Sequence, residues 1–408
     1  MVVYLSTATS KEYLAYCQKY ATKKIVYVQQ QWDYTLCRAF AECYGDEFEA
    51  VTYTPIQTFP SGKCPLKKRY IETRNDFTIH YCGFINLPVI KQISTTCSVI
   101  GIIDRLMKQK NETELTIITH CFYPQSFLAI RELKKRYNVR VFTIIPDLPD
   151  FAYSNLNEKN KFLSKLWAYF NEMKQNLKRV PDGYICFSEY QLNYLEDSKP
   201  FMVMEGFADI ESFDRIMPAP IQSDRKVIVY AGGLKKNYGV EDLVEAVHSM
   251  ERTDCELWLY GEGESKKMIE SLNDPRIHYK GCISKDDVIA LEKSVYMLVN
   301  PRPAEEEYAK CSFPSKLLEY MSSGTPTLTT RLESMPEEYL DKLLFIEHVS
   351  PEGIRSALNK VLDMQVEELN SIALRSRDFV YEKKTPIYQA KRMKDFIMRC
   401  KSDETCNK

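Results

Sequence analysis

The chain of 408 residues has no excess of charge of either sign. Its 55 lysines and arginines face 56 aspartates and glutamates, which leaves a formal net charge of -1. Recruitment of nucleic acid by a global field needs a large positive excess. We therefore expect no nucleic-acid partner, and any anion site must be built from local residues.

Three further patterns are missing. None of the 13 cysteines is spaced Cys-x-x-Cys, so we expect no zinc site. No basic, apolar and small-residue signal pattern opens the sequence, and the cysteines are scattered and odd in number, so we expect reduced thiols and a cytoplasmic location. The longer apolar runs, such as Val99–Ile103 and Leu115–Thr119, are strand-sized and much too short to span a membrane.

The residues that are present favour a folded α/β protein. Hydrophobic residues make up 44% and charged residues 27%, a balance typical of globular chains of this length with two domains. Short apolar runs alternate with helical patterns, as expected for parallel strands covered on both faces. The predicted strands are Val2–Leu5, Lys24–Val28, Leu115–Thr119, Val139–Ile145, Gly183–Phe187, Phe201–Met204, Lys226–Ala231, Glu256–Tyr260, Tyr296–Val299, Thr325–Thr329 and Leu343–Ile346.

This alternation predicts two doubly wound, Rossmann-like domains that face a cleft. We place the first domain at residues 1–200 and the second at residues 201–385. Residues 386–408 are predicted to form a C-terminal helix that packs back on the first domain. Open α/β sheets bind ligands at the carboxyl ends of their strands, so the chemistry is expected there.

A glycine-rich turn follows the strand at Lys226–Ala231. Gly232 and Gly233 allow a ligand close to the backbone, and Lys235 adds positive charge before a helix near Val240. Together they suit a phosphate. A glycine pair after a strand is also a common structural turn.

The most informative stretch is Ser312–Pro326, which follows the acidic run Glu305–Glu307. Pro314 suits the first turn of a helix that Gly324 ends. The N–H groups near Ser315–Leu317 then form a second anion site, and the Glu319 carboxylate could accept two hydrogen bonds from a ribose. The alternative for Glu319 is a solvated helix residue.

In this order, these segments resemble the retaining glycosyltransferases of family four, which have the GT-B fold. The resemblance covers most of residues 201–400 and is strongest at Ser312–Pro326. It is similar to a bacterial branch that assembles capsular or exopolysaccharide repeat units. Further matching segments are Met204–Gly206 with Asp209, Ala231–Leu234, Leu259–Gly263, Lys280–Gly281 and Asn300–Pro301.

The resemblance implies a role for each matching residue. Glu319 corresponds to the second glutamate of the Glu-x7-Glu motif, which holds the nucleotide ribose. Gly232 and Gly233 lie beneath the pyrophosphate, with Lys235 supplying charge. The remaining donor-binding candidates, through backbone or pocket contacts, are Ile283, Phe313, Pro314, Ser315, Lys316 and Leu317.

The sequence departs from the family at one important position. The first glutamate of the motif falls at Cys311, and a thiol cannot replace a carboxylate. Glu307 or Glu306 could reach the sugar instead, or both could be solvated loop residues.

The first half matches the family more loosely, as an acceptor-binding domain. His120 follows a strand at a position where the family has a histidine that touches the donor sugar. A histidine satisfied locally at the strand end is the alternative. Asp147 also ends a strand and could orient the acceptor hydroxyl or cap a turn.

The implied reaction is transfer of a hexose, with retention, from a nucleotide sugar such as a UDP-hexose to a growing glycan, either lipid-linked or free. The sequence has no Asp-x-Asp, so we expect no metal and no further cofactor. Lys159–Val180 is basic with one apolar face, which suits either peripheral contact with the inner face of the cell membrane or a core helix. Two other functions stay open: a nucleotide-sugar epimerase of the same fold, and a non-catalytic partner subunit.

Overall fold

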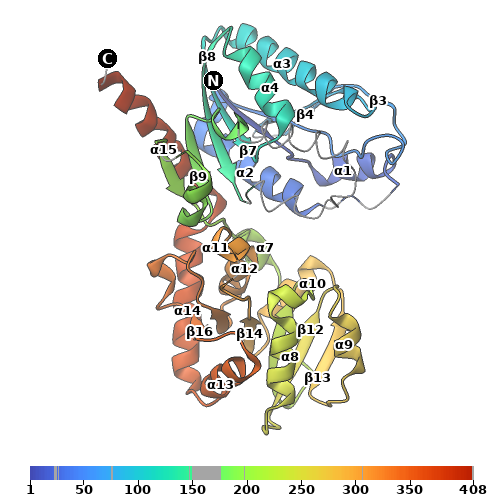
Figure 1. Ribbon diagram of the computed structural model, residues 1–408, viewed down its shortest axis with the longest axis vertical. Coiled ribbons are helices and arrows are strands. Elements are labelled where there is room, and N and C mark those ends of the chain that lie inside the picture. Colours follow the sequence, from blue (N-terminus) through green and yellow to red (C-terminus); the bar gives the residue numbers. More distant parts are fainter. Residues whose placement is uncertain are drawn as a thin grey trace, which may run out of the picture. The chain divides into compact units, whose positions relative to one another are not determined.

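The computed structural model describes residues 1–22, 25, 27–74, 77–146, 148, 176–196, 198–305 and 307–406 (Figure 1). The chain forms two compact units. The first unit comprises Met1–Phe187, Gln191–Met204 and Gln389–Lys408, and the second comprises Ser188–Tyr190 and Glu205–Tyr388.

The first unit is built on an eight-stranded sheet in the order β10-β9-β8-β7-β1-β2-β5-β4. Only β4 runs antiparallel to its neighbour, and the other pairs are parallel. The strands are β1 (Val2–Ser6), β2 (Phe48–Thr52), β4 (Tyr70–Thr73), β5 (Thr78–Tyr81), β7 (Glu114–His120), β8 (Asn138–Ile145), β9 (Gly183–Cys186) and β10 (Phe201–Val203). The connecting elements are α1 (Lys11–Gln18), α2 (Val28–Tyr44), α3 (Ile90–Lys110), α4 (Pro124–Leu133) and the short pair β3 (Leu66–Lys67) and β6 (Phe84–Ile85).

The second unit is built on a six-stranded, all-parallel sheet in the order β13-β12-β11-β14-β15-β16. Its strands are β11 (Lys226–Ala231), β12 (Cys255–Tyr260), β13 (Ile277–Gly281), β14 (Met297–Asn300), β15 (Thr327–Thr330) and β16 (Leu344–Ile346). Its helices are α7 (Ile210–Arg215), α8 (Val240–His248), α9 (Lys266–Ser271), α10 (Lys285–Glu292), α11 (Glu307–Lys310), α12 (Ser315–Ser323), α13 (Pro351–Leu362) and α14 (Val366–Lys383).

Apolar clusters cover both faces of the second sheet. On one face α8 and α13 contribute Val244 and Leu358 to a cluster with Ile228 of β11. On the other face α10 and α12 contribute Leu291 and Tyr320 to a cluster with neighbouring β11 side chains. The continuous apolar runs that predicted doubly covered strands are therefore explained by helices on both sides.

Each sheet changes winding direction next to its first strand. In the first sheet β1 lies between β2 and β7, and in the second β11 lies between β12 and β14. Ligands of open α/β sheets bind beyond the carboxyl ends of the strands at such a switch point. Ligands are therefore expected near the loops after β1 and β7 in the first unit, and near the loops after β11 and β14 in the second.

Three details differ from the sequence-based expectation. Phe201–Val203 does not open the second domain, because it pairs with Tyr184–Cys186 of β9 in the first sheet. Val28 begins helix α2 rather than ending a strand. The run Phe48–Thr52, which was not predicted as a strand, is fully buried and pairs with β1.

The C-terminal helix α15 (Pro386–Cys406) packs on the first unit from Gln389 onward. The Phe396 ring meets Phe142 of β8 edge-on, with ring centroids 5.8 Å apart. Arg140 donates to the Cys400 carbonyl at 3.0 Å, and Lys394 donates to the Cys43 carbonyl at 2.6 Å. Among the described residues, no helix is long and apolar enough to cross a membrane.

Candidate functional site

The loop after β11 is fixed by hydrogen bonds to the neighbouring turn. The Gly232 N–H donates to the Tyr260 carbonyl at 2.9 Å, and the Tyr230 hydroxyl donates to the Gly233 carbonyl at 2.8 Å. A Cβ on Gly261 would lie 1.8 Å from the Gly232 carbonyl oxygen. The backbones of the two turns therefore approach so closely that a side chain at Gly261 cannot fit.

Gly239 joins this loop to the loop after β14. It has φ +73° where α8 begins, and a Cβ there would lie 2.0 Å from the Pro301 carbonyl oxygen. The two loops that flank the switch point are thus in direct contact.

Lys235 brings positive charge to this edge. Its side chain is exposed, and its ammonium group lies 5.4 Å from the Tyr238 ring centre. No carboxylate in the described part of the chain pairs with it, whereas the neighbouring Lys236 lies 3.9 Å from Glu241. Lys235 is therefore available to an anion.

Helix α12 begins at the segment that the sequence singled out. Pro314 precedes it, no side chain caps its N-terminus, and Ser315 is exposed on its first turn. The first N–H groups of an α-helix have no partner inside the helix and carry its positive dipole end. An anion at Ser315 and Lys316 would satisfy them.

The side chains of Phe313 and Leu317 face the protein core. Both belong to one apolar cluster, in which the Phe313 ring lies 5.2 Å from that of Tyr339. The Leu317 N–H donates to the Pro314 carbonyl at 2.8 Å. Of these two predicted donor-binding residues, Leu317 offers a ligand neither its side chain nor its N–H, and Phe313 offers only its backbone.

Lys316 lies between two glutamates. Its ammonium group is 3.6 Å from Glu319 and 3.9 Å from Glu292 of α10. Burial raises the pKa of Glu292 to about 8, Lys316 opposes the rise and Glu319 adds to it. Glu319 itself is partly exposed one turn into α12, so its carboxylate can reach a ligand.

The next residue of α12, Tyr320, connects this helix to the loop after β11, which contains Gly232 and Gly233 and which we call the glycine loop. The Tyr320 hydroxyl accepts from the Ala231 N–H at 2.9 Å and lies 3.3 Å from the Ala231 carbonyl. Ala231 directly precedes Gly232. The glycine loop and the first turns of α12 therefore belong to one site at the carboxyl edge of the second sheet.

Arg302 is a residue of this site that the sequence analysis missed. It follows β14, and it donates to the Ser312 hydroxyl at 2.7 Å. The signal was a basic residue directly after a buried strand, and a strand end at the switch point is where a cation would meet a phosphate.

Three further residues singled out by the sequence follow strands of the second sheet. Glu307 begins the short helix α11 and is exposed, while Cys311 is buried and its N–H donates to the Glu307 carbonyl at 3.2 Å. Ile283 is exposed in the loop after β13. Glu306 and Asp147 lie outside the described residues, as does most of the basic segment 159–180.

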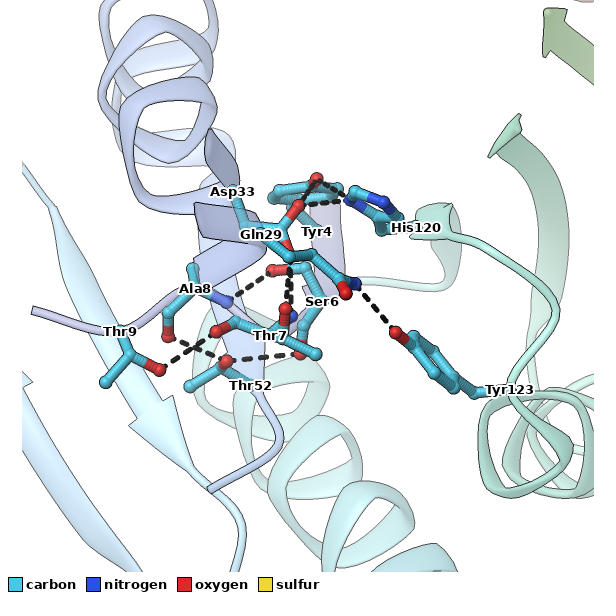
Figure 2. A network of polar contacts seen from close by, with 10 residues as sticks. All are labelled: Tyr4, Ser6, Thr7, Ala8, Thr9, Gln29, Asp33, Thr52, His120 and Tyr123. Atoms are coloured by element: carbon cyan, nitrogen blue, oxygen red, sulfur yellow. Dashed lines mark hydrogen bonds and ion pairs between the residues drawn. The ribbon is translucent and has the colours of Figure 1, made fainter. Parts of the chain in front are cut away.

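In the first unit, His120 lies at the carboxyl end of β7 within a buried polar network (Figure 2). Its Nδ1 contacts Asp33 Oδ1 of α2, and the same carboxylate oxygen accepts from the Tyr4 hydroxyl at 2.5 Å. The other oxygen accepts from the Thr7 N–H at 2.9 Å and the Thr7 hydroxyl at 2.6 Å. The network therefore joins the loops after β1 and β7, which flank the switch point of the first sheet.

This network favours a charged imidazole. Burial is the largest single influence and lowers the pKa of His120, but the Asp33 carboxylate and the neighbouring Cys121 together raise that pKa well above the usual value. The indole ring of Trp32 packs edge-on against the imidazole at 5.2 Å. The ring of His120 is thus held through Nδ1, and the next residue, Cys121, has the rarely adopted φ of +57°.

Asp33 was not predicted. It lies 87 positions before His120, inside an ordinary helix, and nothing in its local sequence marks it. The structure brings His120 and Asp33 together in one unit, and Gly232, Gly233, Lys235, Ser315, Lys316 and Glu319 together in the other.

The match to a known protein family lies in the second unit. Residues 225–364, which include the glycine loop and α12, match a family described as glycosyl transferases group 1. An uncharacterized glycosyltransferase from Methanocaldococcus jannaschii is 26% identical over 150 residues, which are 35% of this chain and 37% of that protein. The match thus spans little more than a third of that relative's length.

Solved structures extend the likeness to the whole chain. A sucrose-phosphate synthase from Thermosynechococcus elongatus has a TM-score of 0.66 at 13% identity, covering 99% of this chain and 100% of its own. HepE from Anabaena in complex with UDP has a TM-score of 0.60 at 11% identity, covering 98% and 99%. This chain therefore has the two-domain, Rossmann-like GT-B fold.

Proposed function

We propose that this protein is a glycosyltransferase that takes a hexose from a nucleotide sugar. The observation that carries the proposal is the combination of the glycine loop, the uncapped start of α12 and Glu319 at one switch point. Two chemical groups of a nucleotide sugar, the diphosphate and the ribose, match the groups offered there.

Each part of the donor has a partner in this proposal. The diphosphate lies over Gly232 and Gly233, against the N–H groups of Ser315 and Lys316, with Lys235 nearby. Glu319 accepts hydrogen bonds from the two ribose hydroxyls. Ile283 borders the base, which we take to be uracil.

The proposed reaction proceeds with retention and without a metal ion. The bond between the sugar C1 and the diphosphate oxygen breaks, the acceptor oxygen bonds to C1 on the same face, and the leaving diphosphate takes the acceptor proton. The helix dipole and the lysines stabilise the growing negative charge. With Nδ1 held by Asp33, the His120 ring presents Nε2 to a sugar hydroxyl.

The product context is also part of the proposal. The acceptor is a growing glycan, lipid-linked or free, in the synthesis of a surface polysaccharide at the inner face of the cell membrane. A second candidate is a partner subunit that binds a nucleotide without transferring sugar. The specific observation in its favour is the buried thiol of Cys311 where a catalytic carboxylate is expected.

Calorimetry with UDP, GDP and ADP tests donor binding. We expect UDP to bind, and Glu319→Ala to weaken it by roughly 10- to 100-fold, because hydrogen bonds to a charged group contribute about 1.5–3 kcal/mol. Glu245→Ala is the matched control, since Glu245 is an exposed glutamate of α8 in the same unit.

Three outcomes would count against the proposal. Failure of all three nucleotides to bind would exclude a nucleotide-sugar enzyme. Equal loss in both variants would remove Glu319 from the site. Nucleotide binding without release of labelled sugar to any glycan acceptor would favour the partner subunit.

A further inference from the structure

A second concave site lies in the first unit, away from the residues discussed above. It is a cavity of about 660 Å³ formed by α1, β3, β4 and the segments that join them. This volume lies within the roughly 300–1,000 Å³ typical of small-molecule sites. The lining residues that matter here are Tyr13, Tyr16, Tyr20, Lys67, Lys68 and Tyr70.

Tyrosines dominate the wall of this cavity, which we call the tyrosine pocket. Tyr13, Tyr16 and Tyr20 recur at helical spacing along and just beyond α1, so they share one face. The Tyr70 ring is parallel to that of Tyr13, with 5.0 Å between centroids. Tyr16 and Tyr70 are 41% and 46% exposed, so aromatic surface is open to a ligand.

Lys67 provides a positive charge inside this aromatic wall. The residue is only 8% exposed, and its ammonium group lies 4.0 Å from the centre of the Tyr16 ring and 5.2 Å from that of Tyr13. No carboxylate in the part of the chain that the structure describes pairs with it. Tyrosine faces attract a cation, but a buried ammonium group without a counter-ion is still costly.

The two acidic residues that line the pocket are already engaged. Glu72 accepts from Ser10 and from Tyr81, each at 2.9 Å, and both Glu72 and Glu12 pair with Arg74. Glu12 accepts from Arg74 at 2.7 Å. The lining is therefore left with a surplus of positive charge on Lys67, Lys68 and Arg69.

The pocket lies at the carboxyl edge of the first sheet. Tyr70 pairs with Tyr81, the last residue of β5, and Ser10 caps α1 directly after β1. This is the edge at which His120 ends β7. A ligand in the pocket would thus occupy the same edge of the sheet as His120.

We propose that the tyrosine pocket binds the acceptor, and that this acceptor is a saccharide carrying a negative charge. The inference rests on the proposed glycosyltransferase function. Sugar rings stack on the open faces of Tyr16 and Tyr70, and the anionic group pairs with Lys67. A uronic-acid carboxylate and a sugar phosphate share this chemistry.

Ligand-observed NMR on the full chain tests the inference and separates the two anions. The probes are methyl glucoside, methyl glucuronide and glucose 6-phosphate, each titrated in the presence of saturating UDP so that the donor site is occupied. We expect at least one charged probe to bind roughly tenfold more tightly than the neutral one, since a charge-assisted hydrogen bond adds that much.

Variants of Lys67 show whether this residue causes the tighter binding of the charged probe. Lys67→Gln should abolish the preference for the charged probe, and Lys67→Arg should keep it. Lys63→Gln is the matched control, because Lys63 is an exposed lysine of the same segment that does not line the pocket. Tyr70→Ala should weaken the binding of all three probes several-fold, because it removes an aromatic face on which the sugar ring stacks.

The inference is overturned if the neutral probe binds as tightly as both charged probes, if Lys67→Gln changes nothing, or if no probe binds. A circular dichroism melt of each variant shows whether it is folded, and Lys67→Arg supplies the test if Lys67→Gln does not fold. UDP binding in the same samples is an independent readout. If no saccharide probe binds while UDP binding is intact, only this inference is refuted. If UDP does not bind, the proposed function is refuted.

Discussion

Asp33 shows how a single buried carboxylate can organise a site. Its oxygens accept from Tyr4 and twice from Thr7, and they hold the ring of His120. A buried charge is tolerated only when it is paired and hydrogen-bonded, and this one has both kinds of partner. The arrangement fixes the orientation of the His120 ring before any ligand binds.

Glu292 presents the opposite situation. It is almost fully buried, and neither carboxylate oxygen has a hydrogen-bond partner among the described residues. Its pKa is raised from 4.5 to about 8, so the folded protein keeps the proton while the unfolded chain loses it. Between about pH 5 and pH 8 the unfolded state binds fewer protons, and stability therefore falls as pH rises.

Glu292→Gln should remove this dependence. We expect the free energy of unfolding of the natural protein to fall relative to that of the variant, by up to about 1.4 kcal/mol per pH unit over this window. Urea denaturation at pH 5, 6, 7 and 8 measures the difference. Glu245→Gln serves as the exposed control, and parallel curves for Glu292→Gln and the natural protein would show that Glu292 titrates normally.

At the scale of elements, two loops depend on glycines in the left-handed region. Gly239 and Gly281 have nearly the same φ, +73° and +76°. A Cβ on Gly239 would collide with the Pro301 carbonyl at 2.0 Å, whereas a Cβ on Gly281 would meet nothing within 4 Å. Alanine substitutions at these two glycines therefore separate the cost of backbone strain from the cost of disturbing the contact between the loops.

We expect Gly281→Ala to cost about 1–2 kcal/mol, the strain of placing a Cβ in the left-handed region. Gly239→Ala should cost more, on the order of 3–4 kcal/mol, because the loop after β14 must also move. It should also weaken UDP binding more than Gly281→Ala does, because only Gly239 contacts the loop after β14. Denaturation and calorimetry on both variants check this, and equal effects would mean that the loop contact is unimportant.

Helix α12 illustrates what a local pattern can predict about an element. Pro314 and Gly324 gave its start and end, and the apolar spacing of Leu317, Leu318 and Met321 matches the face that the structure buries. Phe313 was expected to meet the donor through its backbone, and the side chains of Phe313 and Leu317 complete the core. Whether the donor contacts this segment stays a prediction.

For the whole molecule, α15 is the segment that returns to the first unit. Phe396 is buried against Phe142, while Met398 on the same helix is 55% exposed. Phe396→Ala should lower the free energy of unfolding of the first unit by about 3–5 kcal/mol, as is usual when a buried aromatic ring is removed. Met398→Ala should change it by less than about 0.5 kcal/mol.

Chemical denaturation followed by tryptophan fluorescence measures both variants, with UDP binding recorded in parallel. We expect Phe396→Ala to leave UDP binding unchanged, because the donor residues and their core belong to the second unit. A matching loss of UDP binding would indicate that the two units unfold as one.

The sequence by itself determined the α/β class, the two Rossmann-like domains and the helix between Pro314 and Gly324, because periodicity, proline and glycine act on neighbouring residues. It could not determine that Phe201–Val203 joins the first sheet, since strand pairing depends on which buried edge lies nearby. It could not find Asp33, Arg302 or Lys67 either. Their roles arise from contacts between residues far apart in the chain, which only the tertiary structure brings together.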